Sequence, residues 1–129
     1  MKGVYLLDAC NIVRAGSQGA WRDDDGESRR WIASLERRLE PASRLRVVAV
    51  FDGPRRYRVA AGFLELRFAE GATADDVILD LARASLHEGR RVRVVSWDGT
   101  LVARARDEGA RALTPPEFYR LLPPARMKP

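Results

Sequence analysis

Three short apolar runs in this sequence each end at or just before an aspartate, and this arrangement constrains the fold more than any other feature. The runs and their aspartates are 3–7 with Asp8, 46–51 with Asp52, and 92–96 with Asp98. Runs this short, without regular polar alternation, are typical of strands that are buried on both faces. Such strands occur in parallel sheets that helices cover on both sides.

Two clear helical patterns lie between the runs. The first helix is predicted from a cap at Ser28 to the residue before Pro41. Its apolar stripe is Trp31, Ile32, Leu35 and Leu39. The second is predicted to be capped by Thr73, to begin at Ala74 and to end near Gly89. Its stripe is Val77, Ile78, Leu81, Ala82 and Leu86.

Weaker signals complete the pattern. Residues 59–68 are predicted to contain a further, weaker strand, and 110–113 to form another. Shorter helices are predicted at 101–108 and 115–122, and a loop rich in Gly, Ser and Asp at 14–27. The alternation predicts a single α/β domain over residues 1–122, with a mostly parallel sheet of about five strands and helices on both faces. A Pro-rich tail, 123–129, follows it.

Length and composition exclude several classes of protein. A chain of 129 residues fits one domain with one core, and no apolar run is long enough to span a bilayer. Asp8 interrupts the first apolar run, which argues against a secretory signal. A single cysteine, Cys10, cannot form an internal disulfide, so we expect a protein of the reducing cytoplasm with no membrane association.

The basic charge permits a nucleic-acid partner without requiring one. The net charge is +5, and only two of the 23 basic residues, Lys2 and Lys128, are lysines. Arginine suits phosphate binding because its planar fork can hold two oxygens. A compositional habit of the source organism explains the excess equally well. No glycine-rich phosphate loop is present, which argues against an NTPase or a dehydrogenase.

The aspartates form the main candidate site. Asp8, Asp52 and Asp98 follow strands whose carboxyl ends would share one rim, and Asp75 and Asp76 occupy the first turn of the helix after Thr73. Two carboxylates about 4 Å apart repel by roughly 4 kcal/mol at an effective dielectric of about 20. Several together need protons or cations, and oxygen-only ligands favour Mg²⁺ or Mn²⁺.

Each aspartate also has a simpler explanation. Asp75 and Asp76 suit the start of any helix, where the dipole favours negative charge. Asp52 can open the turn at Gly53, and Asp98 can cap the helix that follows it. Asp8 is harder to explain in this way, because it follows four apolar residues of a strand expected to be central.

Other reactive or aromatic residues have two interpretations each. Arg55, Arg56 and Arg58, with Tyr57 among them, would clamp phosphates and stack a base, or would form a solvated basic loop. Three tryptophans, Trp21, Trp31 and Trp97, are expected to pack in the interior, although Trp97 is also placed to touch a substrate. Cys10 is expected to be a buried packing residue and His87 a surface residue.

Taken in order, these segments resemble the YacP-like NYN family, a branch of the PIN-like nucleases. The matching segments are LDACNI at 7–12, VFDG at 50–53, TADDVI at 73–78, VVSWD at 94–98 and GARALTPPEF at 109–118. The resemblance implies a PIN-like fold and a Mg²⁺- or Mn²⁺-dependent ribonuclease. It implies that Asp8, Asp75 and Asp98 are the main metal ligands, that Asn11 orients Asp8 or a water, and that Asp52 and Asp76 support them.

The sequence therefore favours a metal-dependent endoribonuclease acting on RNA. The chain departs from the family pattern at Ala9 and Cys10, where Gly-Tyr is frequent, and at Ser96 and Trp97, where Thr-Ser is frequent. These departures keep a second hypothesis open, a catalytically weakened RNA-binding module. A phosphatase-like or small-ligand domain is a third. Whether messenger RNA or the ribosome is a partner, and whether the chain is an oligomer, stay open.

Overall fold

The computed structural model describes residues 3–16, 25–42, 44–53, 55, 57–59 and 62–124. Five parallel strands form one sheet in the order β3-β2-β1-β4-β5. The strands are β1 (Gly3–Asp8), β2 (Arg46–Asp52), β3 (Glu65–Ala69), β4 (Arg91–Val95) and β5 (Arg111–Leu113). The helices are α1 (Ala9–Gly16), α2 (Asp25–Leu39), a 3₁₀ turn η1 (Glu40–Ala42), α3 (Ala74–His87), α4 (Gly99–Glu108) and α5 (Pro115–Arg120). The predicted α/β architecture with a parallel sheet is confirmed.

Strand β1 lies at the centre of the sheet. Its Leu6 pairs with Val48 of β2 on one side and Val94 of β4 on the other, and all three side chains are buried. The chain runs outward from β1 through β2 to β3, and then α3 packs across the sheet and leads back to β4. The strand order therefore reverses between β1 and β4, which is where open α/β sheets place their ligands.

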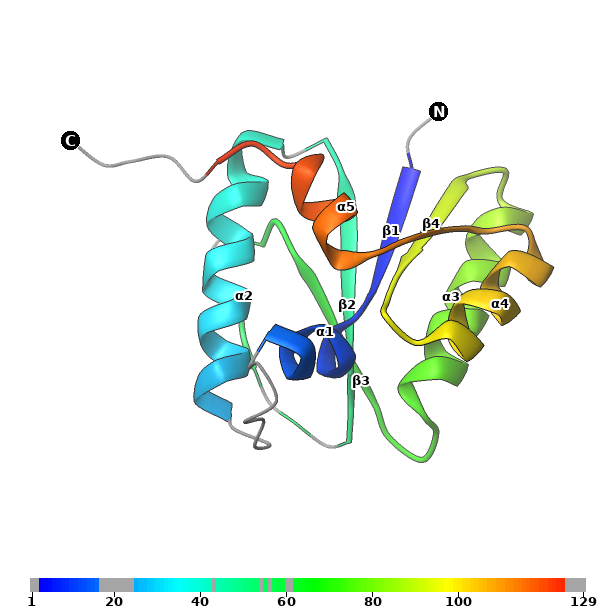
Figure 1. The fold of residues 1–129 in the computed structure, drawn as a ribbon, viewed down its shortest axis with the longest axis horizontal. Helices are drawn as coiled ribbons and strands as arrows, with labels where there is room; N and C mark the ends of the chain where they lie inside the picture. The colour runs from blue at the N-terminus through cyan, green and yellow to red at the C-terminus, as the bar shows by residue number, and fades with distance from the viewer. Residues whose placement is uncertain are drawn as a thin grey trace.

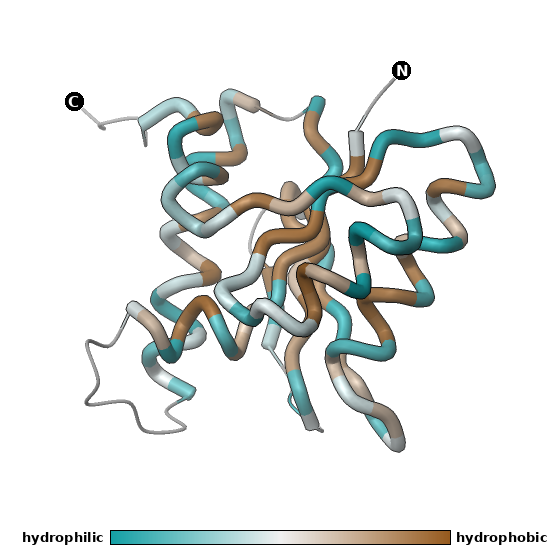
Figure 2. Tube along the Cα trace, turned by 45° about the vertical axis from the view of Figure 1, so that its right-hand side comes forward, coloured by the Kyte–Doolittle hydropathy of each residue, from teal (hydrophilic) through white to brown (hydrophobic). Residues whose placement is uncertain are grey.

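Helices cover both faces of the sheet. Figure 1 shows α1, α2 and α5 on one side and α3 and α4 on the other. Because successive side chains of a strand point to opposite faces, Tyr5 and Leu7 pack under the first group, whereas Val4 and Leu6 pack under the second. The strands accordingly form a hydrophobic interior between more hydrophilic helices (Figure 2).

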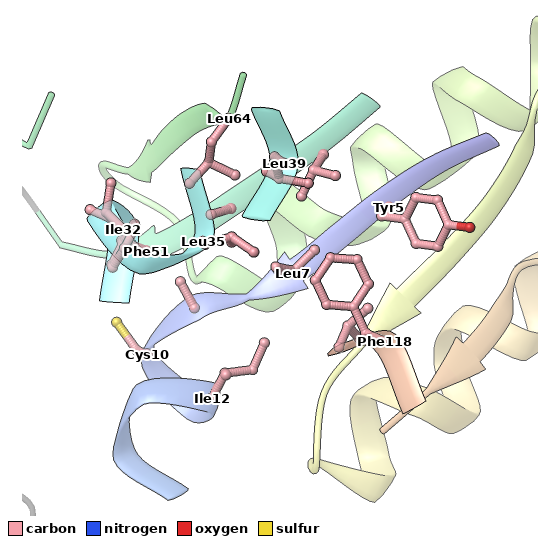
Figure 3. Packing of buried hydrophobic residues seen from close by; sticks show 14 of the residues in the cluster. Tyr5, Leu7, Cys10, Ile12, Ile32, Leu35, Leu39, Phe51, Leu64 and Phe118 are labelled. Atoms are coloured by element: carbon pink, nitrogen blue, oxygen red, sulfur yellow. The ribbon is translucent and has the colours of Figure 1, made fainter. Parts of the chain in front are cut away.

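Aromatic rings fill much of the first face. The ring of Tyr5 lies 5.5 Å from that of Phe118 in α5, and Figure 3 shows both beside Leu7. Arg38 of α2 also donates to the carbonyl oxygens of Tyr119 and Leu122, which ties α2 to the end of α5. Among the described helices, none has both the length and the apolar character needed to cross a membrane.

Several predicted boundaries were wrong, each for a local reason. Helix α1 begins at Ala9, directly after β1, and includes the first residues of the predicted loop, because its Ala9, Cys10, Ile12 and Val13 are buried against the sheet. Helix α2 begins at Asp25, so Ser28 is a buried residue inside it rather than its cap. Part of the predicted loop, residues 17–24, lies outside the described residues.

The third strand occupies only the last part of the segment predicted to contain it and ends one residue later, and the last helix ends at Arg120 instead of Leu122. The backbone N–H groups of Phe63 and Leu64 donate to Oε2 of the buried Glu36, at 2.8 and 3.1 Å, instead of pairing in the sheet. Strand β3 therefore begins only at Glu65. In contrast, the predicted cap at Thr73 is confirmed, since its side chain accepts a hydrogen bond from the N–H of Asp76.

Candidate metal centre

Three carboxylates converge at the carboxyl end of the sheet. Asp8 ends β1, Asp75 lies in the first turn of α3, and Asp98 precedes α4. One carboxylate oxygen from each lies within 4.8 Å of the others. The strand order explains this meeting, because β1 and β4 are neighbours and α3 packs against both. Asp75 and Asp98, which follow Asp8 by 67 and 90 positions in the sequence, are thus brought next to it.

The group carries more negative charge than its surroundings accommodate easily. Only 5% of Asp8 is exposed, and burial is the main reason that its pKa rises from 3.8 to about 6. The hydrogen bond from Ser96 lowers this pKa, whereas the charges of Asp75, Asp52 and Asp98 raise it. The pKa of Asp75 is also raised, first by burial and then by Asp98 and Asp52. A bound cation would favour the ionised form of both.

A buried serine organises the site. The hydroxyl of Ser96 donates to Oδ2 of Asp8 at 2.8 Å and accepts from the backbone N–H of Asp98 at 2.9 Å. Oδ1 of Asn11 accepts from the N–H of Trp97 at 2.8 Å. These bonds fix the 96–98 turn against the end of β1. This role of Ser96 was not predicted from the sequence, although a polar residue that closes an apolar strand two positions before Asp98 was a usable signal.

Asp98 has both of the functions that the sequence left open. Its Oδ1 caps α4 by accepting from the N–H groups of Thr100 and Leu101, at 2.9 and 3.4 Å. The same carboxylate belongs to the group of three. Capping restricts its rotation, so its position relative to Asp8 is set by backbone geometry.

The structure places Asp52 and Asp76 outside that group of three. Oδ1 of Asp52 accepts from the N–H of Ala74 at 3.0 Å, so Asp52 fastens the start of α3 to the end of β2. It thereby positions Asp75, and its charge acts on both Asp8 and Asp75. Asp76 is exposed, and one of its oxygens lies 4.0 Å from a guanidinium nitrogen of Arg104.

The basic segment after β2 is only partly as predicted. Arg55 donates to the carbonyl oxygen of Asp52 at 3.0 Å, which places it at the rim, and Arg58 is exposed. Arg56 lies outside the described residues. Tyr57 is buried against Phe51 and donates to Asp25 at 2.6 Å, so its ring is neither open to a base nor part of a solvated loop, and neither of the two interpretations describes it.

The other singled-out residues divide between interior and surface. Cys10 is buried, as predicted, and burial raises the pKa of its thiol; its sulfur accepts from the N–H of Asp52 at 3.4 Å. His87 is exposed, as predicted. Trp31 is half-buried, whereas 51% of Trp97 is exposed, so the predicted packing of Trp97 is wrong. Trp21 lies outside the described residues.

A model of the YacP-like NYN domain matches residues 5–128, nearly the whole chain. The chain belongs to the YacP-like NYN domain family. All of the carboxylates considered above lie within this match. No curated protein matches the chain significantly.

Two solved structures similar to this NYN domain are crystal structures of Rae1 (YacP) from Bacillus subtilis, one of them a mutant form. The mutant is 24% identical in sequence and superposes with a TM-score of 0.70, over 94% of this chain and 74% of that one. The other is 21% identical with a TM-score of 0.70, over 92% and 72%. At this identity the likeness establishes the fold.

Proposed function

We propose that this NYN domain is a divalent-metal-dependent endoribonuclease that hydrolyses phosphodiester bonds of RNA. The observation that carries the proposal is the convergence of Asp8, Asp75 and Asp98 within 4.8 Å at the strand-order reversal. Membership of the YacP-like NYN family supports it. The single buried cysteine and the basic net charge are consistent with action on RNA in the cytoplasm.

The donor set fits a hard divalent cation. Its three members are carboxylates, without histidine or cysteine, and this chemistry favours Mg²⁺ or Mn²⁺ over zinc. At about 4 Å, two carboxylates repel by roughly 4 kcal/mol at an effective dielectric of about 20, so an ion between them relieves a real cost. Asp8, Asp75 and Asp98 are the residues that would hold it.

A divalent ion held by these carboxylates would supply Lewis-acid polarisation of the phosphate and activation of water. Residues of the chain fix the positions of the carboxylates that would bind the ion. Ser96 fixes the carboxylate of Asp8, and Asp52 fixes the helix that carries Asp75. Oδ1 of Asn11 is engaged by Trp97, so the amide NH₂ is the end of this side chain that can donate to a phosphate oxygen.

Basic residues of the segment that follows β2 would hold the flanking RNA. Arg55 is anchored beside Asp52, and Arg58 is exposed in the same segment. We assign them, with Arg56, to binding of backbone phosphates. Asp76 and Asp52 contribute negative charge around the three ligands.

The test is cleavage of a labelled single-stranded RNA by the purified protein. Mn²⁺ or Mg²⁺ should support cleavage, EDTA should stop it, and Asp8→Asn should reduce the rate by about a thousandfold, because a charged ligand is lost. Asp80→Asn is the matched control, since Asp80 lies in α3, is highly exposed and contacts Arg83. Equal cleavage by Asp8→Asn, or by the native chain in EDTA, would refute the proposal.

A second function, an RNA-binding module without catalysis, is favoured by one observation. The exposed Trp97 stands beside the carboxylates, where the family pattern has a small polar residue. Such a module would retain RNA in EDTA and would leave it uncut when Mn²⁺ is added. Electrophoresis of the RNA after the binding measurement separates the two functions.

A further inference from the structure

A groove with an aromatic lining adjoins the candidate metal centre. It has a volume of about 500 Å³ and lies between α1, the first turns of α2, Trp97 and the start of α5. Its aromatic members are Trp31, Trp97 and Tyr119. A volume of this size falls within the range of small-ligand sites. None of the three carboxylates lines it, so it is a neighbouring surface and not the metal site itself.

The backbone of Trp97 is fixed by a hydrogen bond, whereas its side chain is largely exposed. Its N–H donates to Asn11, and the next residue is Asp98. Yet 51% of the residue is exposed, and the only other large hydrophobic residue so exposed among those described is Leu121. A tryptophan ring that is exposed on a fixed backbone is suited to stacking a planar group at little entropic cost.

Glu27 adds a polar element that lacks a partner. Its Oε2 is buried in the wall of the groove and accepts no hydrogen bond from the described residues. A buried acceptor without a donor is costly, and a ligand that brings an N–H group removes the cost. Arg30 lines the same groove and brings positive charge next to it.

We propose that this groove binds one unpaired nucleobase of an RNA strand whose backbone passes the metal centre. Trp97 stacks on the base, and Glu27 accepts a hydrogen bond from its edge. The proposal rests on the proposed ribonuclease function, and continuity supports it, because Trp97 is joined covalently to Asp98 and by a hydrogen bond to Asn11. Guanine is the favoured base, since its Watson–Crick edge carries two kinds of N–H donor.

Binding is best measured without turnover, in the Asp8→Asn background, by fluorescence anisotropy of a labelled hexaribonucleotide with one guanine among uridines. Trp97→Ala should weaken binding by roughly five- to 100-fold, because a base loses its stacking partner. Trp97→Phe should retain most of the affinity. Leu121→Ala, the matched exposed hydrophobic residue outside the groove, should change it less than twofold. Unchanged binding by a folded Trp97→Ala variant overturns the proposal.

A second hexamer tests Glu27, with the guanine replaced by unsubstituted purine, which stacks but has no N–H donor on its base edge. The guanine hexamer should bind roughly three- to tenfold more tightly. Glu27→Met, which keeps the length of the side chain and removes the acceptor, should abolish this difference while remaining folded. A difference that persists in Glu27→Met contradicts the assignment of Glu27.

Failure of the groove and failure of the catalytic proposal give different results. If the native chain never cuts RNA in Mn²⁺ but binding depends on Trp97, the ribonuclease function is wrong and the base-binding surface stands. If the native chain cuts RNA and Trp97→Ala has an unchanged KM, the ribonuclease stands and the base-binding surface is wrong. A raised KM with an unchanged kcat supports both.

Discussion

The two ends of the sheet both gather like charges, but they do so in opposite ways. At the carboxyl ends, Asp8, Asp75 and Asp98 approach within 4.8 Å, and Asp8 is buried. At the amino ends, four arginines line a cavity of about 300 Å³, namely Arg90, Arg91, Arg93 and Arg111. At the first end the charges converge on one point, whereas at the second they are distributed around the lining of a cavity.

The positive charges of the arginines are compensated by partners or by solvent, whereas the described residues offer the three aspartates no cationic partner of this kind. Arg90 pairs with Glu88 at 3.0 Å, and the guanidinium of Arg93 lies 5.3 Å from the centre of the Tyr5 ring. Arg91 and Arg111 are exposed, so water and salt screen them. The difference shows that burial and convergence of charge, more than its amount, distinguish a candidate site from a charged surface.

The sharpest test of this contrast is the pH dependence of stability in EDTA. Because the pKa of Asp8 is raised from 3.8 to about 6 on folding, the folded state binds more protons than the unfolded state between these values. The free energy of unfolding should therefore fall as pH rises from about 3 to 7, by about 3 kcal/mol from Asp8 alone, with the steepest fall between pH 4 and 6. Urea denaturation of the native chain and of Asp8→Asn isolates this contribution as the difference between them.

Two further results would sharpen or break the contrast. Mn²⁺ at neutral pH should restore the lost stability of the native chain and not that of Asp8→Asn, whereas NaCl at the same ionic strength should restore little. If the free energy of unfolding of Asp8→Asn falls equally between pH 4 and 6, burial and the neighbouring carboxylates do not raise the pKa of Asp8 as described above.

The next effect concerns the serine that organises the acidic end. Ser96→Ala removes the donor to Asp8 and the acceptor for the N–H of Asp98. Affinity for Mn²⁺ should fall by roughly 10- to 100-fold, as expected when a group that orients a ligand is lost. Isothermal titration calorimetry measures this affinity. Ser85→Ala is the matched control, because Ser85 is also buried but lies in α3. Equal losses in the two variants would show a general packing effect.

The smallest effect is expected at the arginine end. Arg93 and Arg111 are partners across β4 and β5, where like charges are unfavourable. Arg111→Glu should stabilise the protein by about 0.5 kcal/mol at low salt, Arg111→Gln by less, and both gains should vanish near 1 M NaCl. Thermal unfolding at two salt concentrations measures this. A large stabilisation would mean that the arginines are as strained as the aspartates.

The parts of the fold that were predicted correctly are those that depend on residues close together in the sequence. The apolar runs before Asp8 and Asp98 predicted two strands, and their parallel arrangement predicted that these side chains would share a rim. The cap at Thr73 predicted the start of α3, and thereby the location of Asp75.

The parts that were missed depend on contacts between distant residues. Glu36 accepts hydrogen bonds from the N–H groups of Phe63 and Leu64, so β3 begins only after them. No pattern in the neighbouring sequence predicts these bonds. The same holds for the bonds of Ser96 to Asp8 and of Tyr57 to Asp25, which join segments far apart in the sequence. The exposure of Trp97 follows from the turn that Asn11 and Ser96 fix, so its residue type alone suggested the wrong location.

The central location of β1 affects how the protein is made. A ribosome completes Asp8 first, but β4, the strand on which Ser96 and Asp98 depend, pairs with β1 only after some 80 further residues have been added. A chain released or cleaved before residue 90 has two of the three carboxylates and no partner on that side of β1. Truncated copies of the protein should therefore lack the complete group of three carboxylates.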